Sequence, residues 1–411
     1  MHKYDVAVIG AGLGGLAAAA LLSSKRKKTI VIEQGISLRD AWGTVEKDGF
    51  VFSVGPALSY GFEQGGTLQE LSARLGIEQK VSVRSRCYQV ALPDHRITVY
   101  ADPAETLEEL RREFRTEIDA LQKFYQDINV TARRISKKYL ARYLACRRSA
   151  AGVIRRYGFS REVMAFFDVQ SRFFFQKPIE DISLSALTIL CCTPPLHLDG
   201  GFKKFGDQLY RVILQHDGDV RYNETAPTIS FNNNGSVNIE TNQGMIEAET
   251  ILFNALPHKH RSMLMIGLLE EVIPTGMFTD VLFLPEYSRA DEFMAISLDA
   301  DEDAVALEGT KAMMVSFASH QDMPHDRQAP IKQLNSLIPF LDDFMFFADE
   351  YVPGAGHAVL PADTALTAPR VKEGTPAFYR TSHKNAFVLS DTPETPLQAV
   401  ATIQQHISRL N

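Results

Sequence analysis

Apolar and polar positions near the start of the chain alternate in a way that predicts three consecutive elements. Asp5 to Ile9 is a short apolar, β-branched run, which predicts a buried strand. Small and apolar residues at 16–22 predict a helix, and Thr29 to Ile32 predict a second strand. Strand, helix and strand at this spacing are typical of a βαβ unit, so we expect an α/β fold that starts at the N-terminus.

Periodicity further along the chain predicts two more groups of elements. The first group surrounds a helix at 67–76, paired strands between 81 and 100 that turn at Pro93-Asp94, and helical sequence over 102–129 and 159–193. The second group is mostly β: a small meander at 229–248, a buried strand at 250–253, strands at 278–284, 293–298, 310–318 and 386–389, and helices at 331–343 and 395–410.

A glycine motif fills the turn between the first strand and the first helix. Gly10, Gly12 and Gly15 form a G-x-G-x-x-G pattern that also contains Leu13 and Gly14. Gly10 permits a tight turn, Gly12 lets a pyrophosphate approach the backbone, and Gly15 lets the helix pack close to the strand. The helix N-terminus offers N–H groups and a positive dipole end to that pyrophosphate. The motif therefore predicts a dinucleotide site.

An acidic residue follows the second strand at the interval that this site requires. Glu33 lies about twenty residues past the glycines and is followed by Gln34, and its carboxylate can accept hydrogen bonds from a ribose diol. The strand before the glycines, the helix after them and this acid together favour dinucleotide binding over a simple glycine-rich turn.

Composition and charge exclude several classes of function. The 411 residues are enough for two or three domains, and the net charge of −7 argues against nucleic acid as a partner. The four cysteines lack the spacing of a zinc or iron–sulfur site, and we predict no metal site. We expect a cytoplasmic location, because neither a signal peptide nor an apolar run of membrane-spanning length is evident.

One stretch of the chain is strongly basic. Residues 129–161 hold ten lysines and arginines and no aspartate or glutamate, and Arg134, Lys138 and Arg142 recur at helical spacing. We interpret 130–157 as a helix with an aromatic and aliphatic side. Two readings remain open for it: a solvated face packed on the protein, or a surface for an anionic membrane or a protein partner.

A phenylalanine-rich stretch follows. Its five aromatic residues either belong to the ordinary core or line a chamber for an apolar small-molecule substrate; they are Phe166, Phe167, Phe173, Phe174 and Phe175.

After Glu33 the chain resembles a known family. Residues 49–56 read GFVFSVGP, and they resemble the G-F-x-F-D-x-G-P strand of the phytoene desaturase and carotenoid isomerase branch of the FAD-dependent amine-oxidase-like flavoproteins. The resemblance implies FAD as cofactor. It also implies a Rossmann-like FAD-binding domain of the GR2 type, into which an α+β substrate domain is inserted. The implied FAD-binding domain comprises 1–90, 195–265 and 370–411, and the substrate domain 91–194 and 266–369.

The same resemblance implies further cofactor contacts. Gly55 and Pro56 end the family strand, and Ala226 falls where relatives place a valine whose backbone meets the adenine. The remaining implied contacts are Asn254 and Ala255 of the N-A-x-P motif, Asp391 at the flavin ribityl chain or diphosphate, and Pro396 and Leu397 at a helix start that faces the flavin.

Three places in the sequence depart from the family pattern and keep other functions open. The positions of the family's G-G-R motif hold Arg39, Asp40 and Ala41, Ser53 replaces an aspartate, and Ser390 replaces a glycine. We count Arg39 as a substitute for the missing arginine. The leading hypothesis is an oxidoreductase for an isoprenoid or other lipid-soluble substrate, with no catalytic residue assigned. The alternatives are an amine or peptide side-chain oxidase, and a degenerate flavoprotein that serves as a binding or partner subunit.

Overall fold

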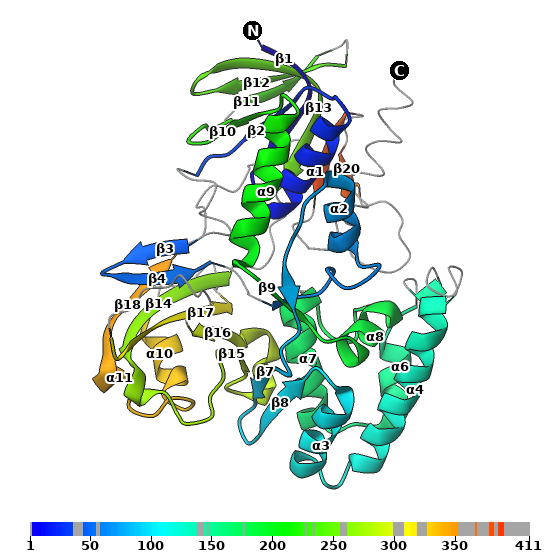
Figure 1. The fold of residues 1–411 in the computed structure, drawn as a ribbon, viewed down its shortest axis with the longest axis vertical. Coiled ribbons are helices and arrows are strands. Elements are labelled where there is room, and N and C mark those ends of the chain that lie inside the picture. Colours follow the sequence, from blue (N-terminus) through cyan, green and yellow to red (C-terminus); the bar gives the residue numbers. More distant parts are fainter. Residues whose placement is uncertain are drawn as a thin grey trace.

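The computed structural model describes most of the chain and shows three regions (Figure 1). A nucleotide-binding sheet with its helices lies at the top, a second sheet at lower left, and a group of helices at lower right. The described residues are 2–35, 44–54, 58–137, 144–145, 148–175, 177–226, 228–232, 235–254, 261–298, 308–318, 327–351, 366–367, 378–381 and 385–389.

The nucleotide-binding sheet joins strands from the beginning, the middle and the last part of the chain. Its strand order is β10-β2-β1-β13-β21-β20-β19, and β12 and β11 continue from β13 as a meander. The contacts of β1 with β2 and β13, of β2 with β10, and of β13 with β21 are parallel. The bounds are β1 His2–Ile9, β2 Thr29–Ile32, β10 Asp219–Arg221, β11 Thr228–Phe231, β12 Val237–Thr241, β13 Gly244–Asn254, β19 Leu366–Thr367, β20 Phe378–Thr381 and β21 Ala386–Leu389.

Two helices lie side by side on one face of this sheet. The α1 helix (Leu13–Ser24) carries four consecutive buried alanines at 17–20, and these small side chains let it pack closely. The α9 helix (Gly201–Gln215) packs beside it through Phe205 and Leu209, which belong to the same apolar cluster as Leu16. The predicted βαβ unit is therefore confirmed.

The second sheet has the order β18-β14-β17-β16-β15-β7-β8. Its strands pair antiparallel, apart from the parallel contact between β15 and β7. The bounds are β7 Arg86–Ala91, β8 Arg96–Tyr100, β14 Arg261–Leu269, β15 Asp280–Phe283, β16 Met294–Leu298, β17 Thr310–Ala318 and β18 Met345–Tyr351. The expected boundaries at 90/91 and 265/266 fall inside β7 and β14, both of which lie in this sheet.

Different elements cover the two faces of the second sheet. The α10 helix (Gln328–Leu334) and the α11 helix (Leu341–Phe344) pack on one face. On the other face, the hairpin of β3 (Thr44–Lys47) and β4 (Phe50–Ser53) packs over the β14 and β17 part. A helical group packs over the β7, β8 and β15 part of that face.

The helical group consists of α3 (Pro103–Glu113), α4 (Ile118–Lys137), α6 (Ala151–Ile154), α7 (Arg161–Phe175) and α8 (Leu184–Cys192). Asp102 caps α3 by accepting a hydrogen bond from the backbone N of Ala104 at 2.9 Å. A short three-stranded sheet of β5 (Leu58–Ser59), β9 (Leu196–Leu198) and β6 (Val81–Ser82) connects the regions, and α2 (Thr67–Leu75) follows β5. The 3-10 turns are η2 Arg155–Tyr157, η3 Glu270–Val272 and η4 Tyr287–Glu292.

The prediction of one helix over 130–157 is wrong. The α4 helix ends at Lys137, and Ser149 forms an isolated bridge with Ser183. Around this bridge the backbone N of Ala150 donates to the carbonyl of Ile182 at 2.9 Å, and the backbone N of Leu184 donates to the carbonyl of Arg148 at 2.6 Å. A tertiary backbone contact therefore replaces the helical hydrogen bonds that the local sequence favours.

Candidate nucleotide-binding site

The loop between β1 and α1 requires glycine at two positions for different reasons. Gly10 adopts φ +99°, a conformation that other residues rarely adopt, and its backbone N donates to the carbonyl of Ile32 at 2.8 Å. A Cβ on Gly15 would lie 2.3 Å from the carbonyl oxygen of Gly10. The tight turn and the close helix–strand approach that the sequence predicts are both present.

The α1 helix starts directly after this loop. Gly12 is the N-cap residue and has no side chain with which to cap the helix, and the first turn contains no acidic residue. Leu13 and Gly14 form the first turn together with Gly15. A helix N-terminus of this kind binds anions through its backbone N–H groups and its dipole.

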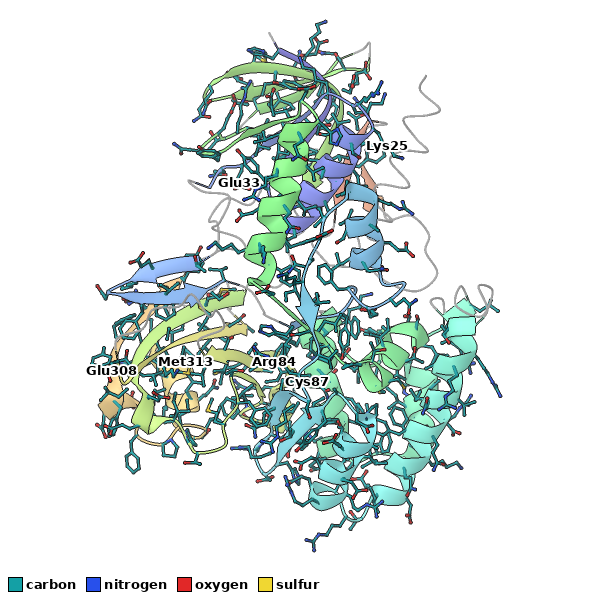
Figure 2. All side chains as sticks on the ribbon, viewed as in Figure 1. Lys25, Glu33, Arg84, Cys87, Glu308 and Met313 are labelled. Carbon is teal, nitrogen blue, oxygen red and sulfur yellow. The ribbon has the colours of Figure 1, made fainter. Side chains whose placement is uncertain are left out.

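Glu33 lies against the same loop. One carboxylate oxygen accepts from the backbone N of Ala11 at 2.6 Å, and the other accepts from the backbone N of Gly35 at 2.7 Å. Figure 2 shows Glu33 in the upper region of the molecule, with the nucleotide-binding sheet. Each oxygen keeps a further lone pair, so this fixed carboxylate can also accept hydroxyl hydrogens from a ribose.

Asn254 ends β13 beside the glycines and borders the site together with the glycine loop and Glu33. Its backbone oxygen would lie 3.0 Å from a Cβ on Gly10, and its side chain lies close to Gly15. Its buried Oδ1 has no hydrogen-bond partner among the described residues. The tight glycine turn, the helix that starts at a glycine and this unsatisfied amide fit the diphosphate and ribose of a dinucleotide.

The predicted cofactor residues divide into three groups. Gly10, Gly12, Leu13, Gly14, Gly15, Glu33, Gln34 and Asn254 all come from the ends of β1, β2 and β13 and the start of α1. Ala226 follows the turn in which the backbone N of Glu224 donates to the carbonyl of Glu33 at 3.0 Å. The predictions for Arg39, Gly55, Pro56, Ala255, Asp391, Pro396 and Leu397 lie outside the described residues.

The phenylalanines of the predicted substrate chamber take two positions. Phe166 and Phe167 are fully buried in the core of the helical group, whereas Phe173, Phe174 and Phe175 are half-buried beside it. Tyr60 packs against two of them, with ring centroids 4.7 Å from Phe174 and 6.0 Å from Phe175. Sequence reasoning missed Tyr60, although it lies only a few residues beyond Gly55 and Pro56.

A small cavity lies beside this aromatic group. Tyr60, Tyr125, Gln170 and Cys191 are among its lining residues, and its volume of about 20 Å³ holds roughly one water molecule. Burial raises the pKa of Tyr60 and of Tyr125 well above the usual value, so both phenols stay neutral. This cavity is far too small for a lipid.

The cysteines and the charged groups add no second site in the described part of the chain. Burial raises the pKa of the Cys87 and Cys192 thiols to about 11, which leaves both protonated and unreactive at neutral pH. Over the residues that the structure describes, no cluster of three or more His, Cys, Asp or Glu side chains could hold a metal ion. Within those same residues, every helix is too short or too polar to span a bilayer.

Comparison with known proteins agrees with this geometry. The family described as the NAD(P)-binding Rossmann-like domain matches residues 8–75, which contain β1, the glycine loop, α1 and Glu33. Prolycopene isomerase from Daucus carota is 24% identical over 74% of this chain and 53% of its own length. A 4,4'-diapophytoene desaturase from Methylomonas is 22% identical over 72% of this chain and 62% of its own length. The chain therefore spans about half to three-fifths of these relatives.

Solved structures share the fold over the whole chain. An oxidoreductase from Methanosarcina mazei has 15% identity and a TM-score of 0.62, covering 98% of this chain and 100% of its own. Rab GDI from Plasmodium falciparum has 14% identity and a TM-score of 0.62, covering 99% of this chain and 98% of its own. A putrescine oxidase variant redesigned in its cofactor binding has 14% identity and a TM-score of 0.59, covering 99% of both chains.

The fold and the site together define the class of this protein. It is a mixed α/β protein with a Rossmann-like nucleotide-binding domain and the architecture of the amine-oxidase-like flavoproteins. Its sequence relatives within that class are the prolycopene isomerases and diapophytoene desaturases, so the resemblance seen at residues 49–56 is confirmed.

Proposed function

We propose that this protein is an FAD-dependent oxidoreductase that acts on an apolar, isoprenoid-like substrate. The observation that carries the proposal is the arrangement of Gly10, Gly15, Glu33 and Asn254 around the start of α1. Relatives in sequence are named for carotenoid substrates, which supports the substrate class. Putrescine oxidase is similar to this chain in fold alone, so the amine-oxidase alternative has weaker support than the isoprenoid-like substrate.

The described residues supply binding and orientation. The N–H groups at the start of α1 would hold the diphosphate, and Glu33 would accept hydrogen bonds from the ribose, while the backbone N–H groups of Ala11 and Gly35 keep its carboxylate in place. FAD, when bound, supplies the hydride-accepting chemistry. The neutral phenol of Tyr60 and the rings of Phe174 and Phe175 form an apolar border that favours a substrate without charge.

Cofactor content is the direct test of this function. Purified protein is expected to be yellow and to release FAD on denaturation, and Glu33→Ala should weaken FAD binding about 10- to 100-fold, because charged hydrogen-bond acceptors contribute about 1.5–3 kcal/mol. Glu46→Ala, on the exposed side of β3, is the matched control and should bind FAD normally. A colourless protein after thorough FAD loading would instead support the binding-subunit alternative, since Rab GDI shows that this fold is not restricted to proteins named as oxidoreductases.

We also propose that the basic surface binds an anionic membrane. Arg133, Arg134, Arg148, Arg155 and Arg156 are exposed, although Arg155 also pairs with Glu180 at 3.3 Å. Two apolar side chains on the same part of the chain are half exposed: Val130 at 49% and Leu144 at 57%. Each basic residue near an anionic leaflet contributes about 1 kcal/mol, and salt weakens the effect.

Vesicle co-sedimentation tests this surface. We expect binding to anionic and not to neutral vesicles, and loss of binding in the double variant Arg133→Glu with Arg134→Glu. Lys25→Glu with Arg26→Glu is the charge-matched control, because Figure 2 places Lys25 at the opposite end of the molecule from the helical group. Equal sedimentation with both vesicle types, or equal loss in the control, would contradict a membrane role.

A further inference from the structure

The turn that follows β10 holds the backbone around Glu33 in place. The backbone N of Glu33 donates to the carbonyl of Arg221 at 2.8 Å, and the backbone N of Glu224 donates to the carbonyl of Glu33 at 3.0 Å. The backbone N of Asn223 donates to the carbonyl of Gly35 at 2.8 Å. Because Gly35 also donates to the Glu33 carboxylate, these bonds hold both the backbone and the side chain of the acid at the cofactor site.

This turn is irregular and is held by contacts from outside it. Tyr222 and Asn223 are exposed, and Asn223 has φ +54°, in the left-handed region. Asn242, in the turn between β12 and β13, accepts from the backbone N of Thr225 at 3.0 Å and donates to the carbonyl of Asn223 at 3.3 Å. The conformation of the turn therefore depends on the meander that packs beside it.

Glu224 is the buried side chain that anchors this turn. The residue is 1% exposed, and one carboxylate oxygen accepts from the hydroxyl of Thr241 at the end of β12 and lies 3.5 Å from the guanidinium of Arg221. The other oxygen is buried and has no hydrogen-bond partner among the described residues. A buried carboxylate oxygen without a partner costs free energy, so stability alone does not account for a charged side chain at this position.

Polar contacts connect Glu224 to β1 as well as to the Glu33 segment. Arg221 donates to the phenol oxygen of Tyr4 at 3.4 Å, and Tyr4 donates to Asp219 at 2.5 Å. Burial and then Asp219 raise the pKa of Tyr4 to about 12, so the phenol keeps its hydrogen at neutral pH. Tyr4 lies in β1 and Glu33 follows β2, so Glu224 is linked to both strands that end at the glycine loop.

We propose that Glu224 is a positioning residue for Glu33. Through Thr241 and Arg221 it orients the turn that holds Glu33, and it thereby sets how strongly the protein recognises the adenosine ribose of FAD. Glu224 acts through this turn rather than by touching the cofactor, because its side chain is fully enclosed. The inference rests on the proposed function, which supplies the dinucleotide.

FAD and its analogue built from 2′-deoxyadenosine test the inference. The two differ in one ribose hydroxyl, and flavin fluorescence measures the binding of each to full-length protein from which FAD has been removed. The parent should prefer FAD about tenfold, because a site that binds a hydroxyl rejects a ligand that lacks it. Glu224→Gln, which keeps the size and removes the charge, should lower this preference several-fold. Thr241→Val removes the hydroxyl at nearly constant shape and should do the same, whereas Thr241→Ser should keep the preference.

Controls separate positioning from folding. Glu240→Gln and Thr228→Val make the same chemical changes at exposed positions of the meander and should leave the preference unchanged. Glu33→Ala has no acid left to position, so adding Glu224→Gln to it should not lower the preference further. A general loss of structure would weaken the binding of both ligands alike and leave their ratio unchanged, and Tm measures that loss separately.

Several outcomes would overturn the inference. These are an unchanged preference in Glu224→Gln or in Thr241→Val, an equal fall in the exposed controls, and a further fall when Glu224→Gln is added to Glu33→Ala. A parent that binds FAD and its analogue equally would also overturn it, although release of FAD would still support the proposed function. A protein that takes up no FAD would overturn the proposed function and this inference with it.

Discussion

Gly15 has no side chain, and this allows α1 to approach the end of β1 closely at the cofactor loop. A Cβ there would meet the carbonyl oxygen of Gly10 at 2.3 Å and the Cβ of Asn254 at 3.1 Å. Gly15→Ala should therefore move α1 away from β1, lower FAD affinity at least tenfold and cost about 1–3 kcal/mol of stability. FAD retention after gel filtration and urea unfolding measure the two effects.

Gly152 provides the matched control for this substitution. It lies in α6, and a Cβ there meets no atom within 4 Å, so Gly152→Ala should stabilise the protein by about 0.5–1 kcal/mol. Normal FAD content in Gly15→Ala would show that the loop tolerates a side chain and that our reading of the site is incorrect.

Phe340 is held in a backbone conformation that suits glycine. It precedes α11 with φ +66° and ψ +18°, and 70% of its surface is exposed. The left-handed conformation costs a bulky residue about 1–2 kcal/mol, so Phe340→Gly should stabilise the protein by about 0.5–1 kcal/mol despite the added chain entropy. Phe346→Gly, in extended β18 and 56% exposed, should instead destabilise it by a similar amount. Urea midpoints of the two variants give the comparison.

At the scale of elements, the β3–β4 hairpin is attached to the second sheet by aromatic packing. Phe52 is 1% exposed, and its ring lies 6.3 Å from Phe50 and 6.1 Å from Phe347. Lys47 and Asp349 form an ion pair at the edge of the same contact. We expect Phe52→Ala to cost about 3–5 kcal/mol in urea unfolding, and Phe346→Ala, at a mostly exposed ring, to cost less than about 1 kcal/mol. Similar costs for the two would show that the hairpin is not part of the folded core.

Local sequence patterns predicted a helix well where neighbouring residues supply both its apolar face and its end. The α2 helix matches the expected 67–76, because apolar residues recur on one face and Gly76 ends it in the left-handed conformation at φ +67°. Residues 102–129 were also expected to be helical, but Phe114 to Glu117 separate α3 from α4. The expected helix at 331–343 is likewise divided, because the turns at 335–340 separate α10 from α11.

At the scale of the whole molecule, the cofactor site joins distant parts of the chain. The strands β1, β2 and β13 all end at the glycine loop, and β21 adds a strand from near residue 390 to the same sheet. A ligand that binds only the folded state at 100 times its Kd adds about 2.7 kcal/mol of stability. We therefore expect FAD to raise the Tm of FAD-depleted protein by several degrees.

The Gly15→Ala variant gives the control for this stabilisation. A side chain at position 15 should disturb the close approach of α1 to β1, so FAD should leave the Tm of this variant almost unchanged. FAD should raise the Tm of Gly152→Ala as much as that of the parent protein. Differential scanning fluorimetry measures the three Tm values with and without FAD. An equal rise in Tm in all three proteins would mean that FAD binds elsewhere.

The sequence by itself determined the nucleotide-binding part of this protein. Gly10, Gly12, Gly15 and Glu33 have local roles at fixed spacing, so the turn, the helix start and the acid could all be predicted from neighbouring residues. Asn254 was located through the family resemblance, because its place beside the loop depends on strands far apart in the chain.

The tertiary structure alone decided the features that depend on long-range contacts. Glu224 and Thr241 belong to no sequence motif, and only the return of β12 to the turn after β10 brings them into contact. The bridge of Ser149 with Ser183 interrupted the predicted basic helix in the same way. Local patterns report which face of an element is apolar, whereas strand register and backbone pairing depend on residues that the local sequence does not contain.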